Sequence, residues 1–508
     1  MHILLASSEV VPFAKTGGLA DVCGALPSEI AKLGHEVSVF MPAFRSVYQH
    51  LTNPEYLPHT LQIPLGKKIV EGGLIRSKLP GANVNIYFVN QQDYFHRHEL
   101  YGENGNDYED NCERFAFFSR GVLESIRLLD LSVDLIHCND WQTALIPALL
   151  QCEYQENPRY QRLASLLTIH NMAYQGSFWH WDMLLTGLNW KYFSWKQMEH
   201  YGRLNLLKTG IVFADAINTV SPTYAREIQG PAQGCGLDSA LRHRADRLSG
   251  ILNGIDTHEW NPRTDHYLPA NFHGPATPRE LISAEALAGK QFCKTELQTE
   301  LKLQVDPQIP LIGIVGRLAS QKGWSLILPV MRKWLERFPV QWAILGTGDP
   351  DFQHVLTTLH RQFPHQLSVT LGFSNELAHR IEAGSDMFVM PSEYEPCGLN
   401  QMYSMAYGTV PVVRRTGGLA DTVVNATRET IDNRTANGFS FDEFTHSGLE
   451  SALANAVNLY HEEPETWRQL MSVGMARDWS WSASAKEYCK LYAETLSRAQ
   501  HRTLNHNS

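Results

Sequence analysis

The stretch KTGGLADV at residues 15–22 decides the fold, and nearly the same stretch, RTGGLADT, returns at residues 415–422. An apolar run, HILLASSEV (2–10), precedes the first copy, and a helical pattern ending near Gly34 and a second apolar run, HEVSVFMPAF (35–44), follow it. Strand, glycine turn, helix and strand in this order make a βαβ unit, and continuous apolar runs suit parallel strands covered on both faces. The first stretch therefore predicts an α/β fold with a parallel sheet.

Strand-like apolar runs continue in both halves of the chain, with helical patterns between them. They lie at 84–89, 133–138, 166–171 and 216–221, and then at 310–318, 342–348, 367–373, 387–392 and 410–415. Two such series predict two Rossmann-like domains, each with its own open parallel sheet. Ligands of such sheets bind beyond the carboxyl ends of the strands, so two facing domains would form a deep cleft.

The length of the chain and one irregular segment set the expected domain boundaries. The chain has 508 residues, more than a single hydrophobic core usually supports. Residues 249–272 are rich in Asn, Gly, Pro and Asp and show little periodicity, so we place the hinge there. We expect an N-terminal domain at 1–248, a C-terminal domain at 249–480, and a final segment at 481–508 that carries a strong helical pattern.

The composition of the chain argues against some classes of binding partner. The net charge of −10 argues against nucleic acid or an anionic membrane surface, because both need a concentrated basic face. The 8 cysteines are scattered, without a CxxC pair or a zinc-like His/Cys cluster, as is typical of a reducing cytoplasm. The N-terminus lacks the basic region of a signal peptide, and no apolar run is long enough to cross a bilayer. We expect a cytoplasmic protein.

The two TGG turns have two possible roles. Paired glycines let backbone amides approach a ligand, and the LAD run after them begins a helix whose N-terminus favours negative charge. Lys15 and Arg415, which introduce the turns, would add positive charge. A tight strand-to-helix turn without a ligand is the alternative. The repetition in matched positions favours a phosphate-bearing ligand held by both turns.

Two further cations follow the first strand of the second half. In GRLASQKG (316–323), Arg317 and Lys322 could neutralise a diphosphate leaving group without a metal, although two solvated surface charges are the alternative. No DxD-like pair stands at a comparable strand end, and HRH (96–98) is interpreted as a surface loop rather than a metal site.

The segment SEYEPCGLNQMYSMAYG (392–408) places Glu395 at a strand end and a helix start after it. Pro396 suits the first helical position, and Gly398, Leu399 and Asn400 would offer free amides in the first turn. A carboxylate there could hold sugar hydroxyls or stabilise positive charge at an anomeric carbon, whereas a helix-capping role is the alternative.

In the first half, HCNDWQT (137–143) and TIHNMAYQGSF (168–178) put Asp140 and His170 directly after strands, so both should face the same edge of the sheet. A single such histidine is more often structural, but several polar residues at strand ends favour a site. Aromatic residues crowd the next stretch, where stacking on sugar rings and a small core cluster are equal alternatives. They are Trp179, Trp181, Trp190, Tyr192, Phe193, Trp195 and Tyr201.

Taken together, these motifs resemble the family of bacterial glycogen synthases and plant starch synthases. The resemblance runs in order from residue 1 to about residue 485 and is carried by KTGGLADV, HNMAYQG (170–176), LNGID (252–256), GRLASQKG, EPCGLNQ (395–401) and RRTGGLADTV (414–423). Single motifs of this set also occur in other two-domain nucleotide-sugar transferases, whereas the combination is highly specific.

The resemblance implies a fold and an activity. The implied fold is GT-B, two Rossmann-like domains with parallel sheets, with the C-terminal helix crossing back to the first domain. The implied reaction is retaining transfer of α-glucose from ADP-glucose to the non-reducing 4-hydroxyl of an α-1,4-glucan such as glycogen or a maltooligosaccharide. No cofactor and no metal are implied, and no residue of the sequence distinguishes an adenine from a uracil base in the donor.

The resemblance also implies site residues by motif. Glu395, His170 and Asp140 would act on the glucosyl unit, Arg317 and Lys322 would bind the diphosphate, and Tyr108 in DYEDN matches a position that lines the cleft. The implied donor contacts also include Lys15, Gly17, Gly18, Asn253, Gly398, Leu399, Asn400, Thr416, Gly417, Gly418 and Leu419.

Two positions depart from related enzymes. Glu393 stands where many family members have a basic or neutral residue, so donor affinity should suffer unless its carboxylate points away. Tyr403 replaces a glutamate that many GT-B enzymes keep, and tyrosine there is usual in the synthase family.

Other classes of protein fit the sequence less well. A dehydrogenase would need GxGxxG directly after the first strand, and a glucan phosphorylase a lysine-bound pyridoxal phosphate. A glycan-binding protein that has lost catalysis is disfavoured by the intact Lys15, Arg317, Lys322 and Glu395.

Overall fold

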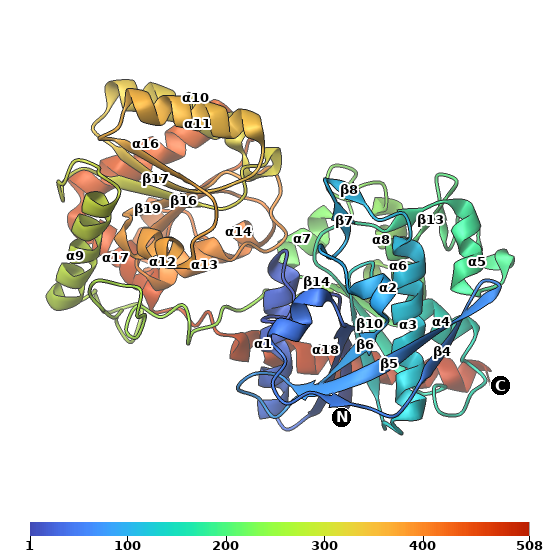
Figure 1. Cartoon of the computed structure of the whole chain (residues 1–508). Helices are drawn as coiled ribbons and strands as arrows, with labels where there is room; N and C mark the ends of the chain where they lie inside the picture. The colour runs from blue at the N-terminus through green and yellow to red at the C-terminus, as the bar shows by residue number, and fades with distance from the viewer. Residues whose placement is uncertain (507–508) are drawn as a thin grey trace. The chain divides into compact units, whose positions relative to one another are not determined.

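The computed structural model describes residues 1–506, and the chain forms two compact units. Unit 1 comprises Met1–Asn253 and the chain from Trp481 onward, and unit 2 comprises Gly254–Ser480. The boundary at Asn253 lies a few residues after the expected one at 248, inside the expected hinge segment. Each unit is an α/β body with its own sheet (Figure 1).

The main sheet of unit 1 has the strand order β15-β14-β10-β9-β1-β2-β6-β5-β3, with β4 paired to β5. From β15 to β6 all neighbouring strands run parallel, and the strands predicted from apolar runs are confirmed there. The bounds are β1 (His2–Ala6), β2 (Glu36–Pro42), β3 (Glu55–Tyr56), β4 (Leu61–Leu65), β5 (Lys68–Lys78), β6 (Asn85–Asn90), β9 (Leu135–Asn139), β10 (Ala164–Ile169), β14 (Ala216–Thr219) and β15 (Leu248–Gly250).

One edge of this sheet differs from the prediction of a purely parallel sheet. β5 runs antiparallel to β6, β4 and β3. The cause is local, because β4 and β5 are joined by a short turn through Gly66, whose φ is +61°, and a hairpin can only return the chain antiparallel. The carboxyl ends of the parallel strands are unaffected.

The helices of unit 1 cover the sheet and carry its connections. α1 begins at the first glycine turn and ends just before Gly34, whose φ of +87° fits the predicted helix end. The helical bounds are α1 (Gly18–Lys32), η1 (Arg45–Gln49), α2 (Gln92–Phe95), α3 (Asn111–Leu128), α4 (Leu145–Cys152), η2 (His180–Asp182), α5 (Met183–Thr186), η3 (Trp190–Tyr192), α6 (Leu206–Phe213), α7 (Pro222–Glu227), α8 (Asp238–His243), η4 (Ala245–Arg247) and α18 (Trp481–His506).

Two small sheets sit outside the main one in unit 1. One is a hairpin of β7 (Gly102–Glu103) and β8 (Asn106–Asp107). The other has the order β11-β13-β12 and is antiparallel, with β11 (Ser177–Phe178), β12 (Glu199–His200) and β13 (Arg203–Asn205). This second sheet belongs to the aromatic-rich stretch that follows His170.

α18 closes unit 1, although it comes last in the chain. It packs against α1 and β10, and its buried tyrosines bond to polar groups of the sheet. The Tyr492 hydroxyl lies 3.0 Å from His137 Nδ1, and Asn218 donates to the Tyr488 hydroxyl at 3.0 Å. The C-terminal helix is therefore part of the first unit.

Unit 2 is built on a sheet of the order β18-β17-β16-β19-β20-β21, in which every pair is parallel. The strands are β16 (Leu311–Val315), β17 (Gln341–Gly346), β18 (Leu367–Leu371), β19 (Met387–Met390), β20 (Val410–Arg414) and β21 (Phe439–Phe441). The helices are α9 (Ala284–Glu300), η5 (Ser320–Lys322), α10 (Trp324–Arg337), α11 (Pro350–Gln362), α12 (Asn375–Gly384), α13 (Asn400–Ala406), α14 (Gly417–Thr422), α15 (Arg428–Asp432), α16 (His446–Glu462) and α17 (Pro464–Met475).

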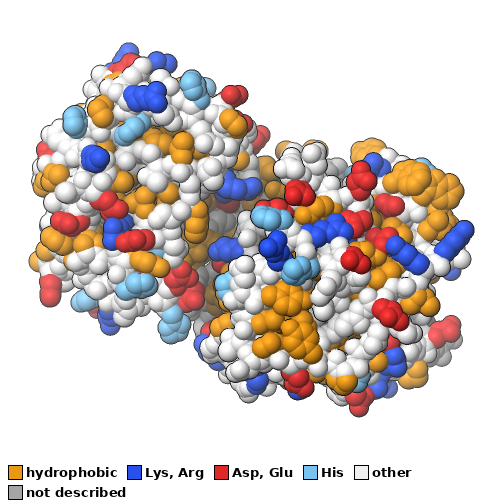
Figure 2. Space-filling model, viewed as in Figure 1, with side chains coloured by type: hydrophobic (Ala, Val, Ile, Leu, Met, Phe, Trp, Pro, Cys, Tyr) orange, Lys and Arg blue, Asp and Glu red, His pale blue; other side chains and the backbone are white. Residues whose placement is uncertain are grey.

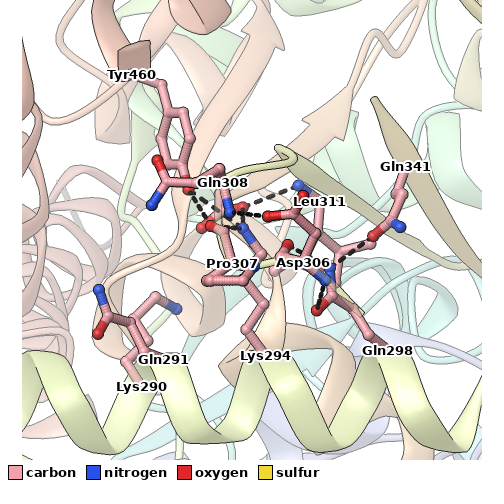
Figure 3. A network of polar contacts seen from close by, with 12 residues as sticks. Lys290, Gln291, Lys294, Gln298, Asp306, Pro307, Gln308, Leu311, Gln341 and Tyr460 are labelled. Atoms are coloured by element: carbon pink, nitrogen blue, oxygen red, sulfur yellow. Dashed lines mark hydrogen bonds and ion pairs between the residues drawn. The ribbon is translucent and has the colours of Figure 1, made fainter. Parts of the chain in front are cut away.

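A polar network ties α9 to the amino ends of the central strands of unit 2 (Figure 3). Buried Lys294 pairs with Asp386 at 2.7 Å, just before β19, and donates to the Pro307 carbonyl before β16. Gln298 donates to Gln341 at the start of β17. All these bonds lie at the amino ends of the strands. The loops at the carboxyl ends of the strands therefore take no part in this network.

Candidate functional site

Polar side chains meet at the carboxyl ends of three adjacent strands of unit 1. Glu9, Asp140 and His170 follow β1, β9 and β10, which are neighbours in the sheet. Asp140 Oδ1 accepts a hydrogen bond from the backbone amide of His170 at 2.7 Å. The structure thus brings together the two residues that the sequence places at strand ends.

Asp140 is a buried carboxyl group on an unusual backbone. Its φ is +54°, a left-handed conformation that side chains other than glycine seldom adopt. Burial raises the pKa of Asp140 to about 7, and the nearby negative charge of Glu9 acts in the same direction. Asp140 therefore titrates near neutral pH, an unusual property that is often found in functional sites.

His170 is neutral and oriented. Its Nε2 lies 2.9 Å from the side-chain oxygen of Asn139, so Nε2 carries the proton and donates it. Burial lowers the pKa of His170 to about 3. Nδ1 forms no hydrogen bond with the described side chains and backbone of residues 1–500 and keeps its lone pair, so the ring can accept a hydrogen bond from a hydroxyl group.

Glu9 is a site residue that sequence reasoning missed. Its buried carboxylate accepts hydrogen bonds from the Thr16 amide at 2.5 Å, the Thr16 hydroxyl at 2.7 Å and the Gly17 amide at 3.3 Å. The Tyr101 hydroxyl donates to it at 2.7 Å. A glutamate directly after the first strand was the available signal, because an acidic residue so close to a glycine turn can bind its amides.

The first TGG turn is therefore only partly open to a ligand. The amides of Thr16 and Gly17 bind Glu9, whereas those of Gly18 and Leu19 donate to no other group in the described chain. A Cβ atom on Gly17 or Gly18 would meet nothing within 4 Å, so packing inside the protein does not require glycine there. Lys15 is exposed and pairs with Asp21 at 2.7 Å.

In unit 2 the loops after β16, β19 and β20 meet at one edge, because these strands are neighbours. Lys322 Nζ lies 2.6 Å from Glu395 Oε2, and the Ser392 hydroxyl donates to the same oxygen at 2.9 Å. Glu395 is buried, and Lys322 is partly exposed. Arg317 is exposed, and its guanidinium group has no hydrogen-bond or ion-pair partner among residues 1–500, whose side chains the structure describes. Three of the predicted residues thus lie at this edge, and two form an ion pair.

The loop that carries Glu395 offers unbonded amides. Those of Gly398, Leu399 and Asn400 donate to no group in the described chain, and Gly398 has a φ of +71°. The side chain of Asn400 donates to the Val315 carbonyl at 2.7 Å, which fixes the start of α13 against the end of β16. The prediction that a helix starts at Pro396 is wrong, because α13 begins at Asn400 and Gly398 lies in the loop before it. The three amides are nevertheless unbonded, as the sequence predicts.

The second TGG turn has a different role from the one expected, and this is a correction. A Cβ atom on Gly417 would overlap the Glu395 carbonyl, and one on Gly418 would overlap the Cys397 carbonyl. The Gly418 amide donates to the Glu395 and Pro396 carbonyls, each at 3.2 Å. The amides of Thr416 and Leu419 also bond within unit 2, to Arg414 and Thr416. This turn supports the Glu395 loop instead of presenting a row of free amides.

Arg415, like Lys15, forms an ion pair at the surface of its own unit. It is exposed, and its Nε lies 2.5 Å from Asp442 Oδ1. Glu393 is also exposed, while its backbone amide donates to Gln321 at 2.8 Å and its carbonyl accepts from Arg414. The backbone of Glu393 thus holds the loop, and the Glu393 carboxylate has no ionic partner among the described residues.

Tyr403 is an internal packing residue of unit 2. Its ring stacks on Trp260 with centroids 3.8 Å apart, and the same indole stacks on His379 at 3.8 Å. Tyr403 thus anchors the segment after the unit boundary to α12 and α13. A glutamate at this place would have no such stacking surface.

Tyr108 and Asn253 lie apart from these contacts. The guanidinium groups of Arg97 and Arg114 lie 4.7 and 5.0 Å from the centroid of the Tyr108 ring, and its hydroxyl donates to the Glu99 carbonyl at 3.3 Å. Asn253 ends the first part of unit 1, and its buried Oδ1 accepts no hydrogen bond within the described chain. Neither residue forms a hydrogen bond with Asp140 or His170 in the described part of the chain.

Among the described residues, no group of three or more His, Cys, Asp or Glu side chains is arranged to hold a metal ion, and His96 and His98 lie on an exposed loop. No helix in the described part of the chain has the length and apolar character needed to span a membrane.

Comparisons with known proteins agree with this geometry. Residues 2–243 match the model of the starch synthase catalytic domain, and residues 299–470 match that of glycosyl transferases group 1. Glycogen synthase of Rhodopirellula baltica is 47% identical over 98% of both chains, and glycogen synthase of Syntrophotalea carbinolica is 46% identical over 98% of this chain and 99% of its own.

A solved structure extends the similarity to the fold. The catalytic domain of starch synthase IV from Arabidopsis thaliana, bound to ADP and acarbose, superimposes with a TM-score of 0.86 at 33% identity. The match covers 98% of this chain and 99% of the starch synthase chain.

Proposed function

Because this chain belongs to the family of glycogen synthases and starch synthases, we propose that it extends an α-1,4-glucan with glucosyl units from ADP-glucose and releases ADP. The chain is a glycosyltransferase of the GT-B class. Its substrates are a nucleotide sugar and a glucan. The proposal adds ADP-glucose as the donor, the non-reducing 4-hydroxyl as the acceptor, and retention of the α configuration.

The observation that carries the proposal is the arrangement around Glu395 in unit 2. Lys322 lies 2.6 Å from the carboxylate, and the unbonded amides of Gly398 to Asn400 follow three residues later. Cations and free amides at the carboxyl edge of a parallel sheet suit a diphosphate. The carboxylate among them is suited to sugar hydroxyls and to positive charge at an anomeric carbon. Arg317, exposed and without a partner, can bind the diphosphate bidentately.

The residues of unit 1 serve the glucosyl unit in this proposal. His170 accepts a hydrogen bond from a sugar hydroxyl at Nδ1, because Nε2 is already committed to Asn139. Asp140 accepts a hydrogen bond from the sugar when its carboxyl group is ionised and donates one when the group is protonated. Both forms are populated near neutral pH, because the pKa of Asp140 lies at about 7. Lys15 and the Gly18 and Leu19 amides add positive potential toward the anionic donor.

We propose that the reaction proceeds on one face of the sugar. The bond from the anomeric carbon to the phosphate oxygen breaks, and the acceptor oxygen bonds to the same face. The acceptor proton moves to a phosphate oxygen of the departing ADP. Arg317 and Lys322 stabilise the charge that develops on the diphosphate, and Glu395 stabilises the oxocarbenium-like carbon. A covalent glucosyl adduct of any carboxylate, trapped and found by mass spectrometry, would overturn this mechanism.

We further propose that the protein needs no metal and works in the cytoplasm. The cations and amides of unit 2 can stabilise the leaving group, and all eight cysteines carry free thiols, as suits a reducing compartment. Turnover that persists unchanged after dialysis against a chelator would support the proposal that the protein needs no metal.

The experiment that tests the function measures release of the nucleoside diphosphate. ADP-glucose and UDP-glucose are compared, with and without glycogen, for the wild type, Glu395→Gln and Glu393→Gln. We expect glycogen-dependent ADP release that falls about 100-fold or more in Glu395→Gln, since an electrostatic contact to the transition state is lost. Glu393→Gln is the matched control for kcat, because its carboxylate is exposed two positions away, and any effect of this variant should be confined to the KM for the donor. Release from neither donor in the wild type would refute the proposal.

A further inference from the structure

In unit 2, the segment that follows the unit boundary packs against α12 and α13, which lie side by side (Figure 1). The indole of Trp260 stacks on His379 of α12 and on Tyr403 of α13, each with centroids 3.8 Å apart and planes 11° from parallel. Two rings cannot share one face of an indole at this distance, so Trp260 is sandwiched between them. We call residues 259–267 the Trp260 segment.

Asp265 connects the Trp260 segment to the same helices a second time. Its Oδ2 accepts hydrogen bonds from His379 Nδ1 at 2.7 Å and from the hydroxyl of Tyr407, directly after α13, at 2.6 Å. Burial acts to raise the pKa of Asp265, but the hydrogen bonds from His379 and Tyr407 lower it overall, so the carboxylate is ionised. Because an ionised carboxylate only accepts hydrogen bonds, His379 carries a proton at Nδ1.

The other ring nitrogen of His379 is placed so that a second proton is favourable. Nε2 is buried and has no hydrogen-bond partner among the described residues, and Oε1 of Glu259 lies 3.8 Å from it. In the neutral ring, the Nε2 lone pair and this carboxylate repel each other. A proton on Nε2 turns the contact into an attraction and leaves a cation stacked on the indole of Trp260, which favours the charged ring further.

The charges that act on His379 are mainly local. Burial alone would lower the pKa of His379, but the hydrogen bond to Asp265 and the nearby Glu259 carboxylate raise it overall. Arg380, the next residue of α12, pairs with Glu376 at 2.5 Å instead. Figure 2 shows acidic and basic side chains interspersed on one face of unit 2, and salt screens such distant charges.

The remaining titratable groups of the packed elements are tyrosines or groups with other partners. Buried Lys290 of α9 donates to the carbonyls of Ala383 and Tyr407. These groups are Tyr267, whose ring centroid lies 5.0 Å from that of His379, Tyr403, Tyr407, Lys290, buried Glu382 on α12, and Arg263 and His266, which are exposed.

Tyr403 connects the Trp260 segment to the edge of unit 2 at which we place the diphosphate. It lies in the first turn of α13, which begins at Asn400, and its amide donates to the Leu399 carbonyl at 3.0 Å. The unbonded amides of Gly398 and Leu399 directly precede this turn, and that of Asn400 opens it. The turn is therefore held by two contacts, the Asn400 side chain on the end of β16 and the Tyr403 ring on Trp260.

We propose that Trp260 and His379 are positioning residues for the donor, which fix the first turn of α13 most firmly when both ring nitrogens of His379 are protonated. The proposal rests on the proposed function, because it concerns the binding of ADP-glucose. As pH rises through the raised pKa of His379, the proton on Nε2 and the attraction to Glu259 are lost. The amides at residues 398–400 are then less well placed, so the KM for the donor rises with pH.

The first test follows the backbone without any substrate. Amide exchange is measured by mass spectrometry in the wild type, Glu259→Gln and Glu376→Gln, at about pH 6 and about pH 8.5, on either side of the usual histidine range. We expect faster exchange in peptides from residues 400–408 of Glu259→Gln at the lower pH only. Glu376→Gln is the matched control, because its side chain is 54% exposed against 50% for Glu259 and pairs with Arg380 instead.

The second test measures the kinetics of the donor across the same pH range. The wild-type KM for ADP-glucose should rise about threefold with pH, while the KM for glycogen does not follow. In Glu259→Gln this rise should occur at lower pH, because His379 loses a neighbouring negative charge. Trp260→Ala should raise the donor KM about tenfold at every pH, and Trp260→Phe, which keeps a stacking ring, should restore most of the affinity.

Equal exchange in Glu259→Gln and Glu376→Gln at the lower pH would overturn the proposal. So would a Trp260→Ala variant that loses folded protein but keeps the wild-type donor KM, since Trp260 would then serve the fold alone. If Trp260→Ala does not fold, Glu259→Gln still decides, because half of the Glu259 side chain is exposed. Failure of the proposed function is distinguishable: the wild type then releases no nucleotide from either donor, whatever the exchange experiment shows.

Discussion

Asp140 links the chemistry of the site to the pH dependence of stability. Its pKa of about 7 in the folded chain lies above that of an unfolded aspartate, about 3.9. Between these values the folded chain holds a proton that the unfolded chain has lost. The contribution of Asp140 to stability therefore falls as pH rises from about 4 to about 7 and is constant above that.

Asp140→Asn should remove this dependence. Asparagine tolerates the left-handed backbone and keeps an oxygen for the His170 amide, so the fold should persist. Between pH 4.5 and 8 the free energy of unfolding of Asp140→Asn should fall less than that of the wild type, and the two decreases should differ by about 4 kcal/mol at most. Urea unfolding at several pH values measures these free energies, and exposed Asp107→Asn is the control. Parallel curves for Asp140→Asn and the wild type would contradict the assignment.

Glu9 acts on both its neighbours in the site. It holds the Thr16 and Gly17 amides, and its charge helps to raise the pKa of Asp140. Glu9→Gln should raise the KM for the donor about tenfold with a smaller change in kcat, because the turn loses charge-assisted hydrogen bonds. The limb of the pH–rate profile that reports Asp140 should move to lower pH, since a neighbouring negative charge is removed.

Ser8→Ala is the matched control for Glu9→Gln. Ser8 bonds to the same Tyr101 hydroxyl at 2.8 Å but not to the turn. If both variants shift the profile alike, the effect comes from the general packing around Tyr101 and not from the Glu9 carboxylate.

At the scale of elements, the two TGG turns show how one string of residues serves two purposes. The first begins α1 with open space above its glycines, and the second begins α14 with carbonyl groups pressed against its glycines. The difference lies in the neighbouring loop, because only the second turn has the 395–398 backbone packed on it.

Equivalent substitutions in the two turns should therefore have opposite effects. Gly418→Ala should lower the stability of unit 2 by about 2–4 kcal/mol, because the methyl group has no space beside the Cys397 carbonyl. Gly18→Ala should leave stability unchanged or slightly raised, and should reduce turnover by obstructing the donor. Calorimetry and donor kinetics on both variants give the answer. Equal loss of stability in both would show that the first turn is also packed from above.

At the scale of the whole molecule, two segments that are far apart in the sequence together form unit 1. α18 follows all of unit 2 in sequence, yet Tyr492 is fully buried in unit 1 and lies beside His137. The stability of the first 253 residues therefore depends on residues near the other end of the chain.

Tyr492→Ala should weaken unit 1 selectively. Loss of a buried aromatic ring costs about 3–5 kcal/mol, so amide exchange should speed up in peptides from residues 1–253 and remain unchanged in unit 2. Lys490→Ala, an exposed position on the same helix, is the control. Faster exchange confined to residues 254–480 would contradict the placement of α18.

Much of the architecture could be predicted, because its signals are local. The apolar runs at 133–138 and 387–392 lie at β9 and β19, and polar residues after them reach the strand ends as expected. The β4–β5 hairpin was missed, since half-exposed strands lack a continuous apolar run. Glu9 was missed for another reason: nothing in its sequence neighbourhood shows that its carboxylate folds back onto the Thr16 amide.

The sequence by itself determined the alternation of strands and helices, the division into two α/β units, and the family. These follow from periodicity and from motifs read within short windows. Only the tertiary structure decided which amides remain free for a ligand, which glycines are packed, and that Arg415 binds Asp442. The physical reason is that a hydrogen bond or a steric contact depends on what lies opposite a residue, and two identical strings, TGGLAD, have different neighbours in space.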